Sequence, residues 1–160
     1  MEFITVEQFK EQPVGVQKVF LDWWNESRYD LVCLEWDATK ELVNEMGINL
    51  EIGIKNKIST YEEIIIYLNN LECLGIENKE LIPLFTEGQL RRFIEDKSNG
   101  IVKLIQWHIE DSQISKRGYA IDILRKNEYH VTYHYKDLGE DLLQAYWKVA
   151  CMVAKEGLNG

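Results

Sequence analysis

The sequence predicts the α+β class, with an antiparallel sheet covered by helices in a single domain over residues 1–160. Apolar and polar side chains alternate in three consecutive segments between Ile101 and Lys136, which is the pattern of a three-strand meander. The next segment, up to Gly157, carries apolar residues at helical spacing, so that one face of this helix can cover the sheet. One or two N-terminal strands are expected in addition to the meander.

Composition and charge limit the kind of protein. The chain has 160 residues, of which 46% are hydrophobic and 28% charged, as in ordinary globular domains. Its net charge of −9 repels phosphate backbones, so general binding to DNA or RNA is not expected. An acidic surface instead suits solubility, or docking to a basic surface of another protein.

The cysteines and the apolar runs bear on location. Cys33, Cys73 and Cys151 are too widely spaced for a metal knuckle and form no disulfide framework. The N-terminus lacks the pattern of a signal peptide, and the longest apolar run, Ile64 to Leu68, is far shorter than the ~20 residues that cross a bilayer. We therefore expect a cytoplasmic protein without membrane contact.

Two helices are predicted at the N-terminus. Thr5 and Gln8 have the spacing of a capping box, in which each side chain bonds the backbone N–H of the other residue. This helix is expected to end near Gln12, because Pro13 disfavours the helical conformation of the residue before it. A second helix, from about Val14 to Trp24, has an apolar face at helical spacing.

The middle of the chain is expected to alternate between strands and helices. A mostly buried strand is predicted over 29–36, a short helix over 38–46 and a half-exposed strand over 48–54. Ser59 and Thr60 precede two glutamates and are expected to cap a helix that ends near residue 71. A further capping box, Thr86 with Gln89, predicts a helix through Asp96 that Gly100 closes.

The C-terminal region predicts three strands and one helix, over residues 101–110, 119–125, 128–136 and, for the helix, from 139 or 140 to 156. The odd-numbered strand positions carry apolar side chains and are expected to face the helix: Ile101, Ile105, Trp107, Ile109, Tyr119, Ile121, Ile123, Tyr129, Val131, Tyr133 and Tyr135. For the odd positions of the last two strands to lie on one side, the residue numbers of each cross-strand pair must have an even sum. That hairpin therefore needs a loop of three or five residues, or a bulge.

The even-numbered positions of these strands carry most of the polar side chains that suggest chemistry: Gln106, His108, Glu110, Asp122, His130, Thr132 and His134. An enzyme or metal site on this face is one hypothesis. His130 and His134, however, are about 13 Å apart along one strand, too far for both to bind one Zn²⁺. We therefore predict no bound metal and no cofactor, and interpret the residues as a polar sheet face.

A ligand site is a second hypothesis. Arg91 and Arg92 lie in the first turns of a helix, where backbone N–H groups and guanidinium groups can hold phosphate or carboxylate. Tyr133 and Tyr135, with His130 and His134, complete the predicted ligand-binding set. Alternatively, the arginines are a solvated helix face paired with nearby acids.

The aromatic residues of the N-terminal third allow two interpretations. Trp23, Trp24, Tyr29 and Trp36 are either core residues or part of a partner-binding surface, where aromatic side chains are common anchors. The core interpretation is favoured. The sequence shows no nucleophile elbow and no glycine-rich phosphate loop, so no catalytic residue is predicted.

Three stretches of the chain resemble small accessory proteins of phages and prophages of Gram-positive bacteria. These are ITVEQFKEQPVGVQKVFLDWW near the N-terminus and LIPLFTEGQLRRFIEDKSNG, together with DLLQAYWKVACMVAKEG at the C-terminus. The resemblance implies a protein made in the cytoplasm of a bacterial host. Small phage proteins of this kind often counter host defence, and the resemblance carries over no functional residue.

The sequence thus predicts a non-enzymatic phage accessory protein that captures a host component. One target is a host defence protein, docked through the acidic or aromatic surface. The other is a small nucleotide signal, held by Arg91, Arg92 and tyrosine rings, with a homo-oligomer left open. The alternative is a small hydrolase or metal-dependent enzyme that uses the His/Asp face.

Overall fold

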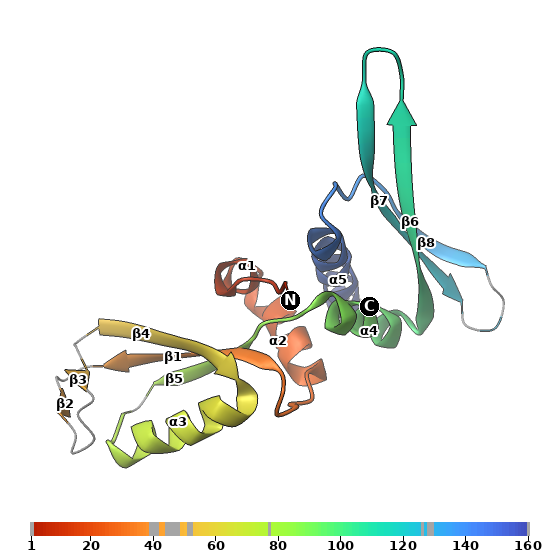
Figure 1. Ribbon diagram of the computed structural model, residues 1–160. Helices are drawn as coiled ribbons and strands as arrows, with labels where there is room; N and C mark the ends of the chain where they lie inside the picture. The colour runs from red at the N-terminus through yellow and green to blue at the C-terminus, as the bar shows by residue number, and fades with distance from the viewer. Residues whose placement is uncertain are drawn as a thin grey trace. The chain divides into compact units, whose positions relative to one another are not determined.

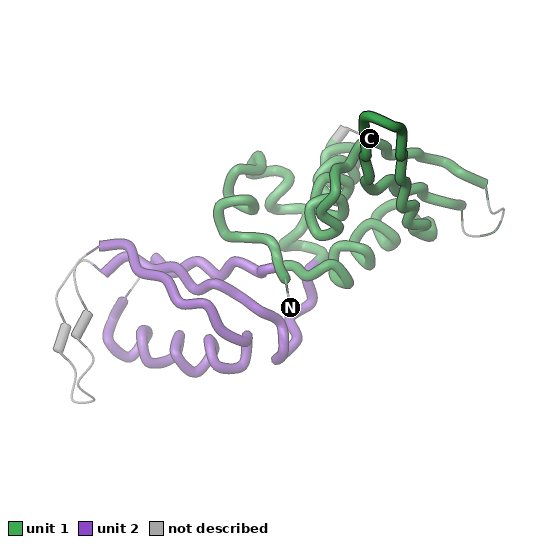
Figure 2. The backbone as a smooth tube through the Cα atoms, turned by 45° about the horizontal axis from the view of Figure 1, so that its top comes forward, with its two compact units in different colours: residues 1–23, 85–160 green, residues 24–84 purple. Residues whose placement is uncertain are grey.

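The computed structural model describes residues 2–38, 42–43, 49–50, 53–76, 78–125, 127 and 130–159. The chain forms two compact units, shown in different colours in Figure 2. The first unit contains residues 1–23 and 85–160, and the second contains residues 24–84. Folding of the whole chain as a single domain stays a prediction.

The helices of the first unit are those that the sequence predicts. They are α1 (Val6–Lys10), α2 (Val14–Trp23), α4 (Glu87–Ser98) and α5 (Leu142–Asn159), labelled in Figure 1. Both predicted capping boxes are present, at Thr5 and at Thr86. The C-cap of α4 is Asn99, whose φ is 50°, and not Gly100, which instead begins a strand.

Aromatic rings fill the core of the first unit. The Phe20 ring is buried and stacks on Phe93 and Trp147, with centroid distances of 4.3 and 5.1 Å. Trp23 meets the edge of Phe93, and its Nε1 donates a hydrogen bond to Asp96. The core interpretation of Trp23 is therefore supported.

The C-terminal meander is confirmed. Its strands are β6 (Gly100–Glu110), β7 (Ser115–Arg125) and β8 (Val131–Tyr135), all antiparallel, in the order β6-β7-β8. Strand β7 begins four residues earlier than predicted, at Ser115 and not at Tyr119. The expected irregularity of the last hairpin is present as a register shift between Ile123 and Leu124.

The prediction that all odd positions of the meander share one face is wrong for β6. Ile105 lies opposite Ala120 and Trp107 opposite Gly118, so odd residues of β6 share a face with even residues of β7. Tyr133 and Tyr135 of β8 do agree in parity with β7, since Ile123 lies opposite Tyr133. Beyond the register shift Val131 lies opposite Leu124, so the prediction is also wrong for Val131, and Tyr129 lies outside the described residues. The cause is the turn of residues 111–114, because an even number of turn residues reverses the parity between paired strands.

The second unit has its own sheet, with strand order β4-β1-β5. Its strands are β1 (Leu31–Ala38), β4 (Gly53–Thr60) and β5 (Lys79–Pro83), and helix α3 (Tyr61–Cys73) packs on it. Val32, Leu34 and Trp36 of β1 pack with Ile64 and Leu71 of α3 in one buried cluster. Thr60 caps α3, as predicted.

Two predictions for the middle of the chain need correction. The helix expected over 38–46 is wrong where the structure describes it, because Ala38 ends β1 and β2 (Leu42–Val43) pairs with β3 (Asn49–Leu50). The rest of that prediction lies outside the described residues. Of the strand expected over 48–54, residues 49–50 belong to β3 and residues 53–54 begin β4, while residues 48, 51 and 52 lie outside the described residues. Strand β4 extends to Thr60, and β5 was not predicted.

The α+β class with antiparallel sheets covered by helices is confirmed. Strands β1 and β4, however, form a separate sheet with β5, in which β1 pairs with both, and they do not extend the meander. Among the described helices, none has the length and apolar content that crossing a bilayer requires.

Candidate functional site

The meander has two faces that differ in their surroundings. We call the side that carries Ile121, Ile123, Tyr133 and Tyr135 the helix face, because Tyr135 Oη donates a hydrogen bond to Glu156 of α5. Figure 1 shows α4 and α5 on one side of the sheet. We call the opposite side the open face.

An apolar row runs along β6 on the open face. It consists of Ile101, Ile105, Trp107 and Ile109, of which Ile109 is 59% exposed and Ile101 is 36% exposed. The Trp107 ring lies against Gly118 of β7, where an added Cβ would stand 2.7 Å from Trp107 Cζ2. Glycine at position 118 thus leaves room for the Trp107 ring. The row that the sequence places against the C-terminal helix is therefore on the other side of the sheet.

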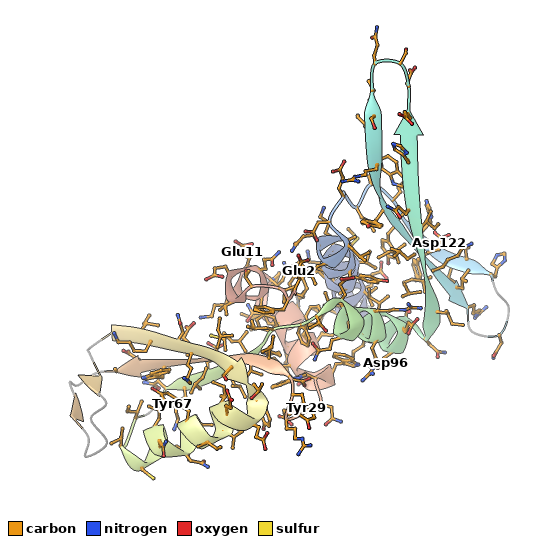
Figure 3. All side chains as sticks on the ribbon, viewed as in Figure 1. Glu2, Glu11, Tyr29, Tyr67, Asp96 and Asp122 are labelled. Carbon is orange, nitrogen blue, oxygen red and sulfur yellow. The ribbon has the colours of Figure 1, made fainter. Side chains whose placement is uncertain are left out.

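The charged groups of the open face surround one buried carboxylate. Asp122 is only 8% exposed, and its Oδ1 contacts Nδ1 of His134, its neighbour across β7 and β8. Lys103 lies opposite Asp122 on β6. Figure 3 labels Asp122 on this sheet. A buried carboxylate is unfavourable unless it has a polar partner. His134 supplies this partner, so its position is explained by the structure without a catalytic role.

The three histidines do not converge, contrary to the idea of one polar His face. His108 is on the helix face, where its Nε2 lies 3.2 Å from Ser115 Oγ and where Gln106, Arg117 and Glu140 line the same hollow. His130 precedes β8, and its carbonyl accepts a hydrogen bond from the Arg125 N–H. No three His, Cys, Asp or Glu side chains among the described residues are placed to hold a metal ion. The enzyme hypothesis keeps only the Asp122–His134 pair.

The tyrosines line a pocket on the helix face. The rings of Tyr133 and Tyr135 stack with centroids 6.2 Å apart and an interplanar angle of 18°. Their pocket has a volume of about 330 Å³ and is also lined by Lys97 and Ser98 of α4 and Glu156 of α5. Burial, reinforced by Glu156, raises the pKa of Tyr135 to about 12, so its hydroxyl stays a neutral donor.

The predicted arginines lie elsewhere. Arg91 Nη2 donates to the Val102 carbonyl and Arg91 Nε to Glu95, both at 3.4 Å, while Glu95 accepts the Val102 N–H at 3.0 Å. Arg91 therefore links α4 to β6. Arg92 is exposed, and neither arginine is among the residues that line the tyrosine pocket.

The predicted ligand set is thus divided over four places: the arginines on α4, the tyrosines on the helix face, His134 on the open face, and His130 in the segment before β8. Whether these residues bind a ligand stays a prediction. Sequence reasoning missed Lys97 and Ser98, which reach the pocket from the end of α4. It also missed the position of Trp107 and Ile109 on the open face, because Ser115–Gly118 shows no apolar alternation that would have revealed the start of β7.

The N-terminal aromatic set is mostly core. Trp36 is buried beside Tyr67, and Trp24 meets Tyr61 edge-on while its Nε1 donates to Asp30. Tyr29 is the exposed member, with the Arg28 guanidinium 4.6 Å from its ring centroid.

No model of a protein family, no curated protein and no solved structure matches the chain. Its function therefore has to be inferred from its own residues.

Proposed function

We propose that this protein is a non-enzymatic binding protein that captures another protein through the open face of the β6-β7-β8 sheet. The observation that supports this best is the apolar row on β6, in which Ile101 and Ile109 are exposed and Ile105 and Trp107 are half-buried. Exposed apolar patches on soluble proteins commonly mark interaction sites. Trp107, at the centre of the row, is the kind of residue that anchors protein interfaces.

The charges of the open face define the chemistry of the partner. Lys103 and Lys116 lie on this face, and the Asp122 carboxylate is already paired with His134. The apolar row therefore has two lysines beside it and one acid, Asp111, at the hairpin turn, although the whole chain has a net charge of −9. The charges close to the docking surface matter most for the choice of partner, because salt screens charges that are more than about 8 Å away. The partner we propose has an apolar patch with acidic groups at its margin.

The biological context that we propose follows from the resemblance to phage accessory proteins. The protein acts in the cytoplasm of a bacterial host, and its partner is a host defence protein.

Affinity capture from a lysate of a Gram-positive bacterium tests this proposal when two matched variants are compared. Ile109→Asp places an acid on the open face, whereas Ile66→Asp alters a similarly exposed isoleucine on α3, which is 62% exposed. We expect a partner that the wild-type protein and Ile66→Asp retain and that Ile109→Asp loses. A partner held equally by Ile109→Asp would refute docking through the open face.

A second candidate function is binding of a small nucleotide in the tyrosine pocket. The stacked pair Tyr133 and Tyr135 next to Lys97 favours it, because aromatic rings stack on bases and an ammonium group attracts phosphate. Glu156 in the same pocket disfavours an anion.

Calorimetric titration with cyclic and ADP-ribose-type nucleotides separates the two candidates. Binding that Lys97→Ala abolishes and Arg92→Ala preserves would support the tyrosine pocket. Binding that is lost in Arg91→Ala and Arg92→Ala instead would support the arginine site predicted from the sequence. Absence of binding across the panel would exclude the nucleotide function.

A further inference from the structure

Strand β6 is an edge strand, and helix α4 closes one end of its free edge. The Val102 N–H is bound by Glu95 and the Val102 carbonyl by Arg91, so both backbone groups of Val102 point away from β7. Backbone groups alternate in direction along a strand. The N–H and C=O groups of Leu104, Gln106, His108 and Glu110 therefore also point outward.

The rest of this edge is open. Within the described part of the chain, the outward backbone groups of Leu104, Gln106 and His108 meet no hydrogen-bond partner, and no proline interrupts β6. Figure 1 shows β6 continuing past α4 toward the hairpin tip. Long edges of this kind are templates for pairing with another strand, and proteins usually protect them. Arg91 and Glu95 protect only the Val102 end.

We propose that two copies of this chain pair antiparallel through their β6 edges, with Trp107 opposite Trp107 of the partner subunit. The free edge runs from Leu104 to Glu110, and Trp107 is its midpoint. Only a pairing centred on Trp107 uses this free edge in full.

Side-chain chemistry selects the same register. On the open face it places Ile105 opposite Ile109 of the partner subunit, and Lys103 opposite Asp111 of the partner subunit. On the helix face, Gln106 meets His108 of the partner subunit. Cross-strand pairs of apolar residues and of opposite charges stabilise a sheet.

The neighbouring registers bring less favourable residues together across the two strands. Outward groups must meet outward groups, so the register can shift only in steps that keep even residues opposite even residues. A shift in one direction places Lys103 opposite Ile109 and Glu110 opposite Val102, whose backbone groups α4 already binds. A shift in the other direction places Asp111 opposite Ile105.

The dimer would join two meanders into one continuous sheet and place their open faces side by side. This inference goes beyond capture of another protein, and its tests read the state of association and not a partner. A monomeric protein that still captures its partner would contradict the dimer alone.

Sedimentation equilibrium of Gln106→Pro tests the edge. Proline at position 106 removes an outward N–H and leaves the β6–β7 hydrogen bonds in place, whereas Gln106→Thr keeps the N–H. We expect a dimer for the wild-type protein and for Gln106→Thr, and a monomer for Gln106→Pro. A wild-type monomer at every concentration, or a folded Gln106→Pro dimer, would overturn the proposal.

Cysteine cross-linking tests the register independently, in a Cys73→Ser background that removes the exposed thiol. In the proposed pairing, Trp107→Cys lies opposite itself at a distance that a disulfide spans. Copies with Ile105→Cys mixed with copies carrying Ile109→Cys should also cross-link, and these copies keep Trp107. Efficient oxidation of both sets supports the register. Preferential cross-linking of Gln106→Cys with itself, or no cross-link in either set, contradicts it.

Discussion

The environments of the three cysteines differ sharply. Cys33 and Cys151 are buried and Cys73 is exposed on α3. Burial raises the pKa of Cys151 to about 12, so this thiol is neutral as well as covered, whereas nucleophilic attack needs the thiolate. With a thiol reagent at pH 8, we expect Cys73 to react in the folded protein and the other two only after denaturation. Mass spectrometry of the labelled peptides checks the assignment, and rapid labelling of Cys151 would show that α5 is packed differently.

The same thiol makes stability depend on pH. In the unfolded chain Cys151 loses its proton near its ordinary pKa of 9.0, but in the folded protein only near 12. Between these values the unfolded state binds fewer protons, so the free energy of unfolding should fall as the pH rises. Tyr135 acts in the same direction between 10.0 and about 12. Denaturant midpoints measured at pH 8 and pH 11 test this, and Cys151→Ala should reduce the difference while Cys73→Ser leaves it unchanged.

Gly118 has a steric reason to be glycine. A methyl group there would meet Trp107 Cζ2 at 2.7 Å and the Gly139 carbonyl at 3.1 Å, so the tryptophan ring would have to move. We expect Gly118→Ala to destabilise the protein by about 1–3 kcal/mol, as overpacking usually does. Gly88→Ala is the matched control, because nothing lies within 4 Å of its added Cβ and alanine favours a helix. Equal stability of the two variants would mean that Trp107 does not lie on Gly118.

At the scale of the element, local signals explain why the helices are predictable. A capping box is decided within four residues, and the apolar spacing of a helix within two turns. Strand β5 and the start of β7 lack such a signal. Strand β5 is short and ends at Pro83, and its place is set by pairing with β1, far away in the sequence.

The capping box of α4 provides a test at this scale. Thr86 Oγ1 accepts the Gln89 N–H, and Gln89 Oε1 accepts the Thr86 N–H at 3.0 Å. We expect Thr86→Ala to lower the free energy of unfolding by about 1 kcal/mol, because one orphan N–H group of the helix loses its partner. Thr86→Ser keeps the hydroxyl and should stay near the wild-type stability in the same denaturant titration. A similar loss in Thr86→Ser would point to the Thr86 methyl group instead of the cap.

At the scale of the whole molecule, the sequence predicts which residues form the apolar row, but not the face of the sheet on which the row lies. Alternation assigns Ile105, Trp107 and Ile109 to one side of β6. It does not say which side of β7 they join, because the number of residues in the intervening turn decides that. The turn of residues 111–114 reverses the expected parity, so that His108 and His134 lie on opposite faces of the sheet.

Both proposals depend on this register between β6 and β7. It exposes the apolar row for capture of a partner, and it turns the backbone groups of Gln106 and His108 toward the free edge. A strand paired one residue away would turn Trp107 toward α5 and hide the surface that we propose for docking.

Cross-strand nuclear Overhauser effects between Hα protons measure the register directly. Pairs that do not share hydrogen bonds bring their Cα atoms within about 4.5 Å, which gives strong Hα–Hα signals. The structure predicts these signals between Gln106 and Tyr119 and between His108 and Arg117. Strong signals instead between Trp107 and Tyr119, or between His108 and Gly118, would contradict the register, the open face and the edge.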